Sequence, residues 1–203
     1  MAKLIQDIKG EINSAYIEAP FDEGLEILEK ENYRIISLEE NAKLRMQEGK
    51  DSFISKNGNQ VKEDIIYIPK KGKYLTKISH ISKNAKKAAN YYQNDSDFYL
   101  NDKQIEESLS DSVALSVDSI PVNHLEDYEI INYIFGEYAK KYGEFLREAG
   151  INKLNIYTSN LQDKPFARKI WFCRLYDVWS SLNSYDKTLN YYGPRVCIRG
   201  IKR

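Results

Sequence analysis

Two cysteines and two histidines are the residues whose side chains could most readily support catalysis or metal binding, namely Cys173, Cys197, His80 and His124. Zinc sites gather such residues at short, regular spacings. Here the histidines lie 44 positions apart and both cysteines are distant from them. We therefore expect no metal ion, and we expect each histidine to be a hydrogen-bonded structural residue.

The two thiols also lack the surroundings that activate a cysteine. A nucleophilic thiolate is favoured by a neighbouring histidine or a helix N-terminus that lowers its pKa, and the sequence places neither beside Cys173 or Cys197. Two cysteines are too few for a disulfide scaffold, and they can pair only if neighbouring strands bring them within reach. We expect free thiols in a reducing compartment.

Motifs for other kinds of catalysis are missing from the sequence. The glycines are isolated, and Gly72 in PKKGK has neither a Walker nor a dinucleotide-binding context. Ser112 and Ser116 lie in no G-x-S-x-G elbow. No cofactor is therefore expected.

The whole-chain composition fits one globular domain of 203 residues with 42% hydrophobic residues and balanced charge. Thirty basic and thirty acidic residues argue against a general nucleic-acid or membrane footprint. Charge is nevertheless uneven: residues 43–87 hold twelve basic and four acidic residues, whereas residues 95–129 hold one basic and ten acidic. We interpret these runs as solvated faces. Without a long apolar segment at the N-terminus or elsewhere, we expect a cytoplasmic protein with no membrane span.

The segment 173–193 differs from the rest in composition, because thirteen of its 21 residues are Ser, Tyr, Asn, Asp, Gly or Cys. Leu175, Leu182 and Leu189 recur every seven residues within it. Neither a helical nor a strand period is sustained. Tyr offers amphipathic contact area at low entropy cost, while Ser, Asn and Gly supply adaptable hydrogen bonds, as in antibody loops. The alternative is an ordinary polar loop pinned by a few apolar side chains.

The expected helices and strands are segregated along the chain and do not alternate, which predicts an α+β fold for the protein that positions this segment. A capping box at Ser37–Glu40 predicts a helix up to Gly49, and Asn57–Gly58 predicts a hairpin turn. A mixed strand or helix is expected within 1–20. The other expected helices are 22–31 (capped by Asp22), 82–92, 102–109 and 124–149, the last ended by Gly150. The expected strands are 33–36, 61–68 with its partner 73–78, 113–117, 153–157, 166–175 and 196–201.

Several stretches resemble the variable proteins of archaeal diversity-generating retroelements. In the C-terminal third these are FARKIWF at 166–172, the polar block with its spaced leucines, and RVCIRGI at 195–201. Upstream, ISLEENAKLR at 36–45, ISKNGN at 54–59 and FGEYAKKYGEFLREAGI at 135–151 are similar to the scaffold of the same group. The likeness begins at about residue 33.

This resemblance implies a C-type lectin fold, of the kind shared with formylglycine-generating enzymes. It also implies that a reverse transcriptase copies a template RNA with errors at adenines and that the altered copy replaces the 3′ end of the gene. Residues 1–165 would then be a constant scaffold with an N-terminal elaboration, and residues 166–203 a variable region that ends in a core strand. Lys187 fits the adenine-directed pattern poorly and is taken as scaffold.

The resemblance further implies a hypervariable ligand-binding surface for a macromolecule, a protein in the first place, with the oligomeric state left open. Its anchors, expected to face inward, are Trp171, Leu175, Trp179, Leu182 and Leu189. Its variable, ligand-binding residues are Cys173, Arg174, Tyr176, Asp177, Val178, Ser181, Asn183, Ser184, Tyr185, Asp186, Asn190, Tyr191, Tyr192 and Gly193.

Two other functions stay open. One is a lectin-fold enzyme related to formylglycine-generating enzymes that uses Cys173 or Cys197. The other is a basic nucleic-acid adaptor that contacts phosphates through Lys70, Lys71 and Lys73. The first hypothesis, a non-enzymatic binder, predicts that function depends on the tyrosines of 176–192 and tolerates changes at those lysines.

Overall fold

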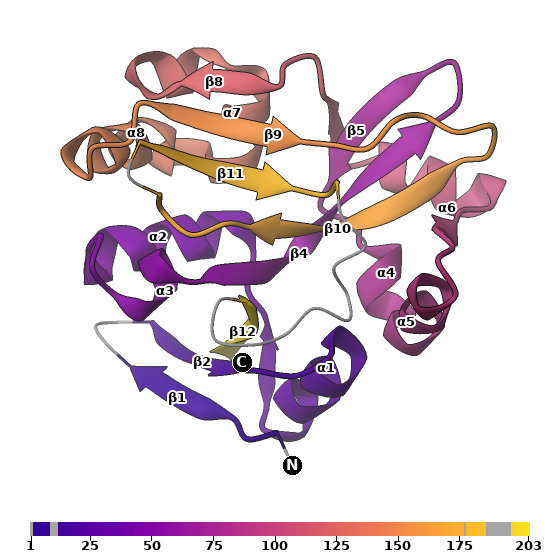
Figure 1. Ribbon diagram of the computed structural model, residues 1–203, viewed down its shortest axis with the longest axis horizontal. Helices are drawn as coiled ribbons and strands as arrows, with labels where there is room; N and C mark the ends of the chain where they lie inside the picture. Colours follow the sequence, from indigo (N-terminus) through magenta and orange to yellow (C-terminus); the bar gives the residue numbers. More distant parts are fainter. Residues whose placement is uncertain (1, 9–11, 177, 186–195) are drawn as a thin grey trace.

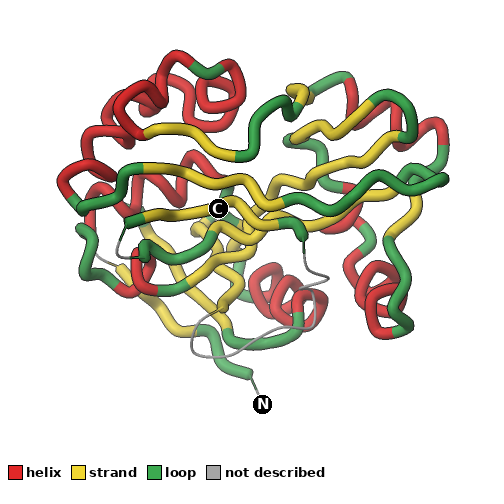
Figure 2. Tube along the Cα trace, turned by 45° about the horizontal axis from the view of Figure 1, so that its top comes forward, coloured by secondary structure: helices red, strands yellow, loops and turns green. Residues whose placement is uncertain are grey.

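A computed structural model of the chain describes residues 2–8, 12–176, 178–185 and 196–203. The strands form one twelve-stranded sheet in the order β1-β2-β12-β4-β10-β11-β9-β8, with β3, β5, β6 and β7 pairing at its sides. Helices gather in separate groups around these strands rather than alternating with them (Figures 1 and 2). The α+β class predicted from the sequence is confirmed.

The boundaries of the elements are as follows. The strands are β1 (Ile5–Ile8), β2 (Asn13–Ile17), β3 (Tyr33–Ile35), β4 (Gly58–Ile68), β5 (Gly72–Thr76), β6 (Phe98–Tyr99), β7 (Ser112–Ala114), β8 (Ser119–Pro121), β9 (Lys153–Tyr157), β10 (Phe166–Phe172), β11 (Trp179–Asn183) and β12 (Val196–Lys202). The helices are α1 (Phe21–Lys30), α2 (Leu38–Glu48), α3 (Phe53–Lys56), α4 (His80–Lys83), α5 (Ala85–Gln93), α6 (Asp102–Leu109), α7 (Glu129–Phe135), α8 (Ala139–Glu148) and the 3-10 helices η1 (Val122–Asp127) and η2 (Gly136–Tyr138).

The C-terminal strand lies in the middle of the sheet. β12 runs parallel to β4 and antiparallel to β2 and β3, so the N-terminal hairpin β1–β2 joins the sheet through the last strand of the chain. On the other side of β4 come β10 and then β11, which pairs in parallel with β9. Because of this order, removing β12 would separate β1, β2 and β3 from the rest of the sheet.

Two hydrophobic cores lie against the sheet. The larger one joins α2, α7 and α8 to the strands β4, β9, β10 and β11, with Phe135, Tyr142 and Phe172 packed ring to ring. The smaller one joins α1 and α5 to β2 and β12. β11 therefore rests on the larger core, which fixes the segment with the unusual composition.

Several local predictions are confirmed. The Ser37 hydroxyl accepts from the Glu40 amide at 3.2 Å, and the Glu40 carboxylate accepts from the Ser37 amide at 2.9 Å, which is a complete capping box for α2. The strands β4 and β5 pair through the predicted turn, where Gly72 has a φ of 116°. The helix at 102–109 and the strand at 153–157 have the predicted boundaries.

The predicted continuous helix at 124–149 is wrong. The chain forms η1, α7, η2 and α8 there, because Gly136 has a φ of 52° and ends α7. Such a φ is open to glycine and interrupts a right-handed helix. Gly150, with a φ of 86°, does end α8 as predicted.

The predicted hairpin turn at Asn57–Gly58 is also wrong. Asn57 is extended and ends α3, and Gly58 begins β4. A Cβ atom on Gly58 would lie 1.6 Å from Nε1 of Trp171, so the glycine serves a close approach rather than a turn.

Other predicted boundaries differ as well. The strand predicted at 166–175 ends at Phe172, and the strand predicted at 113–117 spans Ser112–Ala114. Residues 1–20 contain the hairpin β1–β2, and Pro20 rather than Asp22 precedes α1. The helix at 82–92 is divided into α4 and α5 at Asn84. The segment 173–193, for which neither helix nor strand was expected, contains β11.

Candidate functional site

Strand β11 carries the middle of the compositionally unusual segment and is held in the sheet on both sides. Its residues pair in register with β9, from Trp179 opposite Lys153 to Asn183 opposite Tyr157. Leu182 also pairs with Phe172 of β10 and is completely buried in the larger core. The predicted inward position of Leu182 is therefore confirmed.

The other predicted anchors occupy different positions. Leu175 is partly buried against the larger core, and its amide donates to the Ser55 carbonyl at 2.8 Å. Trp171 is partly buried and covers the backbone of Gly58. Leu189 lies outside the described residues.

Trp179 is not an inward anchor but part of a surface row of aromatic rings. Its ring stacks on Tyr176 with centroids 4.0 Å apart, and Tyr157 of β9 meets it edge-on at 6.1 Å. The guanidinium of Arg174 lies 4.7 Å from the Tyr176 ring centre, which is a cation–π contact. We call Arg174, Tyr176, Trp179 and Tyr157 the aromatic row.

A groove of about 370 Å³ follows this row, lined by Arg174, Leu175, Tyr176, Val178 and Trp179. Apolar side chains are exposed at this groove and elsewhere along β9 and β11: Val178 in the groove lining is 50% exposed, Tyr157 of β9 is 41% exposed, and Tyr185 beyond the end of β11 is 59% exposed. Isolated exposed apolar residues are ordinary, whereas several on neighbouring strands are typical of an interaction surface. Tyr157 was not among the predicted site residues; its exposed position on a strand could not be read without the pairing of β9 and β11.

Three residues predicted to lie on the binding surface are buried instead. The side chains of Cys173, Ser181 and Ser184 are 3%, 0% and 0% exposed. Ser184 shares a 2.7 Å hydrogen bond with the hydroxyl of Tyr67, which also accepts from the Ser159 amide at 3.0 Å. The surface position predicted for these three residues is wrong, because they lie directly after β10, within β11 and directly after β11, where the paired strands enclose their side chains.

The remaining predicted site residues divide into two groups. Arg174, Tyr176, Val178, Asn183 and Tyr185 are at least partly exposed. The Asn183 side chain accepts from the Tyr185 amide at 2.8 Å and so shapes the end of β11. The predicted residues that lie outside the described part of the chain are Asp177, Asp186, Asn190, Tyr191, Tyr192 and Gly193.

The backbone before the aromatic row is held by a buried cation. Arg45 of α2 is completely buried, and its Nη2 donates to the Cys173 carbonyl at 2.8 Å and to the Phe172 carbonyl at 3.4 Å. Its guanidinium lies 4.0 Å from the Phe172 ring centre. The buried positive charge of Arg45 is therefore stabilised by two carbonyl acceptors and by the face of an aromatic ring.

A second buried cation holds the backbone after β11. Arg168 of β10 pairs with Asp97, with Nε 2.7 Å from Oδ1, and its Nη1 donates to the Tyr185 carbonyl. Gln162 donates to the same carboxylate at 2.7 Å. The exposed side chains of 174–185 thus stand on a backbone whose two ends are fixed by residues outside that stretch.

Neither arginine was predicted as a site residue from the sequence. Charged residues are mostly exposed, so an isolated charged residue such as Arg45 gives no sign that it is buried. For Arg168 a signal exists, because Arg168 and Lys169 are the two charged residues of the otherwise apolar strand FARKIWF.

Both thiols are buried, with Cys173 3% exposed and Cys197 2% exposed. Burial raises the pKa of Cys197 to about 12, and its Sγ lies 3.3 Å from Oδ1 of Asn59. A thiolate is the reactive form, so this pKa disfavours the enzyme hypothesis for Cys197.

The histidines lie in separate surroundings. His80 is buried with Nε2 3.6 Å from Glu107, and His124 is exposed with Nδ1 3.5 Å from Asp127. Among the residues that the structure describes, no three His, Cys, Asp or Glu side chains are grouped so that they could hold a metal ion. No helix in the same residues is both long and apolar enough to cross a membrane.

We compared the sequence and the structure with those of known proteins. No family model and no curated protein sequence matches the chain. A solved structure reported under the description "Accommodation of massive sequence variation in Nanoarchaeota by the C-type lectin fold" is similar, with a TM-score of 0.63 over 100% of this chain and 97% of that one. The two sequences are 13% identical, so the similarity concerns the fold. The chain has a C-type lectin fold, as the sequence motifs predicted.

Proposed function

We propose that this protein is a non-enzymatic binder whose C-terminal surface is diversified by a retroelement through adenine-directed mutagenesis. Residues 1–165 form the constant scaffold in this proposal, and residues 166–203 contain the variable region. The ligand is a macromolecule, and a protein in the first place, because large amphipathic rings such as those of the aromatic row are the side chains that anchor protein interfaces.

One structural observation carries the proposal. The exposed side chains between 174 and 185 stand on a backbone fixed from outside by Arg45 and Arg168. Their identities can therefore change while these backbone contacts persist. Exposed substitutions usually alter stability by only about 0.5 kcal/mol, whereas binding can change by several kcal/mol at an aromatic anchor. The similar solved structure, described as accommodating massive sequence variation, supports the same division.

The exposure of each side chain predicts which codons should vary. Variation is expected at Arg174, Tyr176, Val178, Asn183 and Tyr185, which reach the surface. Codons for Leu182, Ser181 and Ser184 should stay constant, since these side chains are completely buried. Trp179 belongs to the aromatic row, whereas the sequence predicted it to be a constant anchor.

The test is deep sequencing of the 3′ end of the gene in its source population, together with the adjacent DNA. Variation concentrated at the exposed codons, and matched to adenines in a nearby template repeat, is the expected result. A 3′ end as uniform as the rest of the gene overturns the proposal. Uniform variation across buried and exposed codons alike contradicts the role assigned to the scaffold.

A further inference from the structure

A cavity of about 690 Å³ lies away from the C-terminal segment, between the start of α2, the strands β3 and β4, the chain after β5, and α4. None of the residues that line it falls within 166–203. Its volume is within the range of sites for small molecules. In the function proposed above, this cavity belongs to the constant part of the protein.

Three lysines on the cavity wall are without carboxylate partners. The ammonium groups of Lys62, Lys77 and Lys83 are not within ion-pair distance of any Asp or Glu in the described ranges. Lys77 instead lies 4.4 Å from the ring centre of Tyr133. Three cations around one concave site favour an anionic occupant.

The acidic groups of the wall are largely neutralised by other partners. Glu40 pairs with Arg34, and Glu39 pairs with Lys43 at 2.7 Å. Glu63 is 3% exposed, and one of its oxygens accepts from the Leu38 amide at 3.0 Å. Burial raises the pKa of Glu63 to about 7, so near neutral pH this carboxyl opposes an anion less than an ordinary glutamate would.

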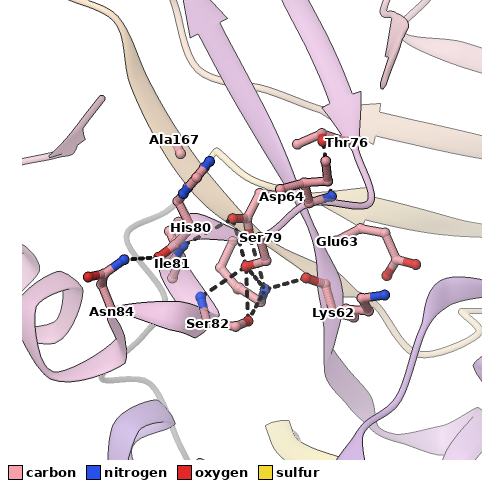
Figure 3. Close-up of polar contacts among 12 residues, drawn as sticks. Lys62, Glu63, Asp64, Thr76, Ser79, His80, Ile81, Ser82, Asn84 and Ala167 are labelled. Carbon is pink, nitrogen blue, oxygen red and sulfur yellow. Dashed lines mark hydrogen bonds and ion pairs between the residues drawn. The ribbon is translucent and has the colours of Figure 1, made fainter. Parts of the chain in front are cut away.

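Two serines of the cavity wall, Ser79 and Ser82, belong to a buried hydrogen-bonded cluster (Figure 3). The Lys169 ammonium donates to Asp64 at 2.8 Å, to Ser79 Oγ at 3.0 Å and to Ser82 Oγ at 2.9 Å. Ser79 also donates to Asp64 at 2.8 Å. These bonds fix Ser79 and Ser82, which both line the cavity, without using Lys62 or Lys83 side chains.

We propose that this cavity binds a small phosphorylated molecule, with its phosphoryl group among Lys62, Lys77 and Lys83. A phosphoryl group carries close to two negative charges and three strong acceptor oxygens. Lysine ammonium groups are compact point charges with three donors each and suit such a group without requiring a planar geometry. The cavity volume of about 690 Å³ suits a small molecule with one phosphoryl group, and we propose such a molecule over a nucleic-acid backbone.

The test is isothermal titration calorimetry of the full chain with inorganic phosphate and with AMP, at low and moderate salt. The test variant is Lys62→Gln/Lys83→Gln, which removes two wall charges. The matched control is Lys140→Gln/Lys141→Gln, two exposed lysines of α8 outside the cavity. Thermal unfolding of both variants verifies that each is folded.

The expected result is binding that the cavity variant weakens at least tenfold and the control leaves unchanged. Tighter binding of AMP than of phosphate identifies a phosphorylated metabolite, and equal binding identifies phosphate itself. Equal losses in both variants, or no binding of either probe at millimolar concentration, overturn the proposal. An oligonucleotide that binds much more tightly than AMP, with steep salt dependence, overturns it in favour of nucleic-acid binding. The cavity contains no residue of the aromatic row. The outcome of this titration therefore does not test the proposal that the C-terminal surface is diversified.

Discussion

Arg45 reaches across 128 positions of the sequence to donate a 2.8 Å hydrogen bond to the carbonyl of Cys173. This contact links α2 to the first residue of the compositionally unusual segment. Arg45 also donates to the neighbouring Phe172 carbonyl and covers the Phe172 ring. These contacts fix the backbone from which the exposed side chains of the following residues project.

Replacing Arg45 with Met should lower the free energy of unfolding by about 2 kcal/mol, because two buried carbonyls lose a charged donor. Met keeps much of the volume and the contact with the Phe172 ring. The matched control is Arg174→Met, which removes a partly exposed arginine from the aromatic row and should change stability by about 0.5 kcal/mol or less. Urea unfolding of the three proteins measures both differences. Equal losses in the two variants would show that Arg45 does not hold the backbone.

The sequence was informative where a local rule decides the structure. Ser37 and Glu40 satisfy each other within one helical turn, so the start of α2 could be predicted from four residues. The β4–β5 hairpin and the C-type lectin fold were also predictable, the latter through motifs rather than through physics.

The sequence was uninformative where distant residues decide. Gly136 is consistent with a helix until its positive φ is known. Ser181 and Ser184 look like surface residues until β11 is placed between β9 and β10. Tyr157 joins the aromatic row only because β9 lies beside β11. Likewise, nothing local shows that Arg45 is a buried cation.

Leu182→Ala should lower the free energy of unfolding by about 2–5 kcal/mol, because it leaves a cavity in the core beside Phe172 and Ile156. Val178→Ala, at a position 50% exposed, should change it by about 0.5 kcal/mol or less. Chemical unfolding compares the two. A Val178 variant as unstable as the Leu182 variant contradicts the division into variable surface and constant anchor.

Glu63 should make the stability fall as the pH rises from about 4.5 to about 7. Its pKa is raised from 4.5 to about 7 by burial, so the folded protein binds a proton more tightly than the unfolded chain does. Below about pH 4.5 the carboxyl is protonated in both the folded and the unfolded chain, so Glu63 costs little stability. Between about pH 4.5 and pH 7 the free energy of unfolding falls, because only the unfolded chain ionises readily. Above about pH 7 the loss is constant. At 1.36 kcal/mol per pKa unit, the penalty at pH 8 is about 3 kcal/mol.

The charged and titratable groups near Glu63 come from several elements, and the comparison of variants must separate their effects. They are Arg34, Glu39, Glu40, Lys62, Asp64, Lys77, Lys83, Tyr133 and Lys169. Glu63→Gln keeps an oxygen for the Leu38 amide and cannot ionise. It should match the unmodified protein at pH 4.5 and exceed its stability at pH 8, as denaturant unfolding at both pH values would measure. A Gln variant that is less stable at pH 8 would show that the ionised carboxylate is favourable in the fold.

Gly58 and Trp171 should prove energetically coupled. A Cβ atom at position 58 would lie 1.6 Å from Nε1, 2.3 Å from Cε2 and 2.7 Å from Cζ2 of the Trp171 ring, so Gly58→Ala must displace the indole. Overpacking of this kind costs about 1–3 kcal/mol. Trp171→Leu removes the ring and with it the clash. In a double-mutant cycle, Gly58→Ala should therefore cost at least about 1 kcal/mol less in the Trp171→Leu background than in the unmodified protein. If the two changes were additive, the cost of alanine at position 58 would lie in the backbone of β4, and the close approach would not explain why glycine begins that strand.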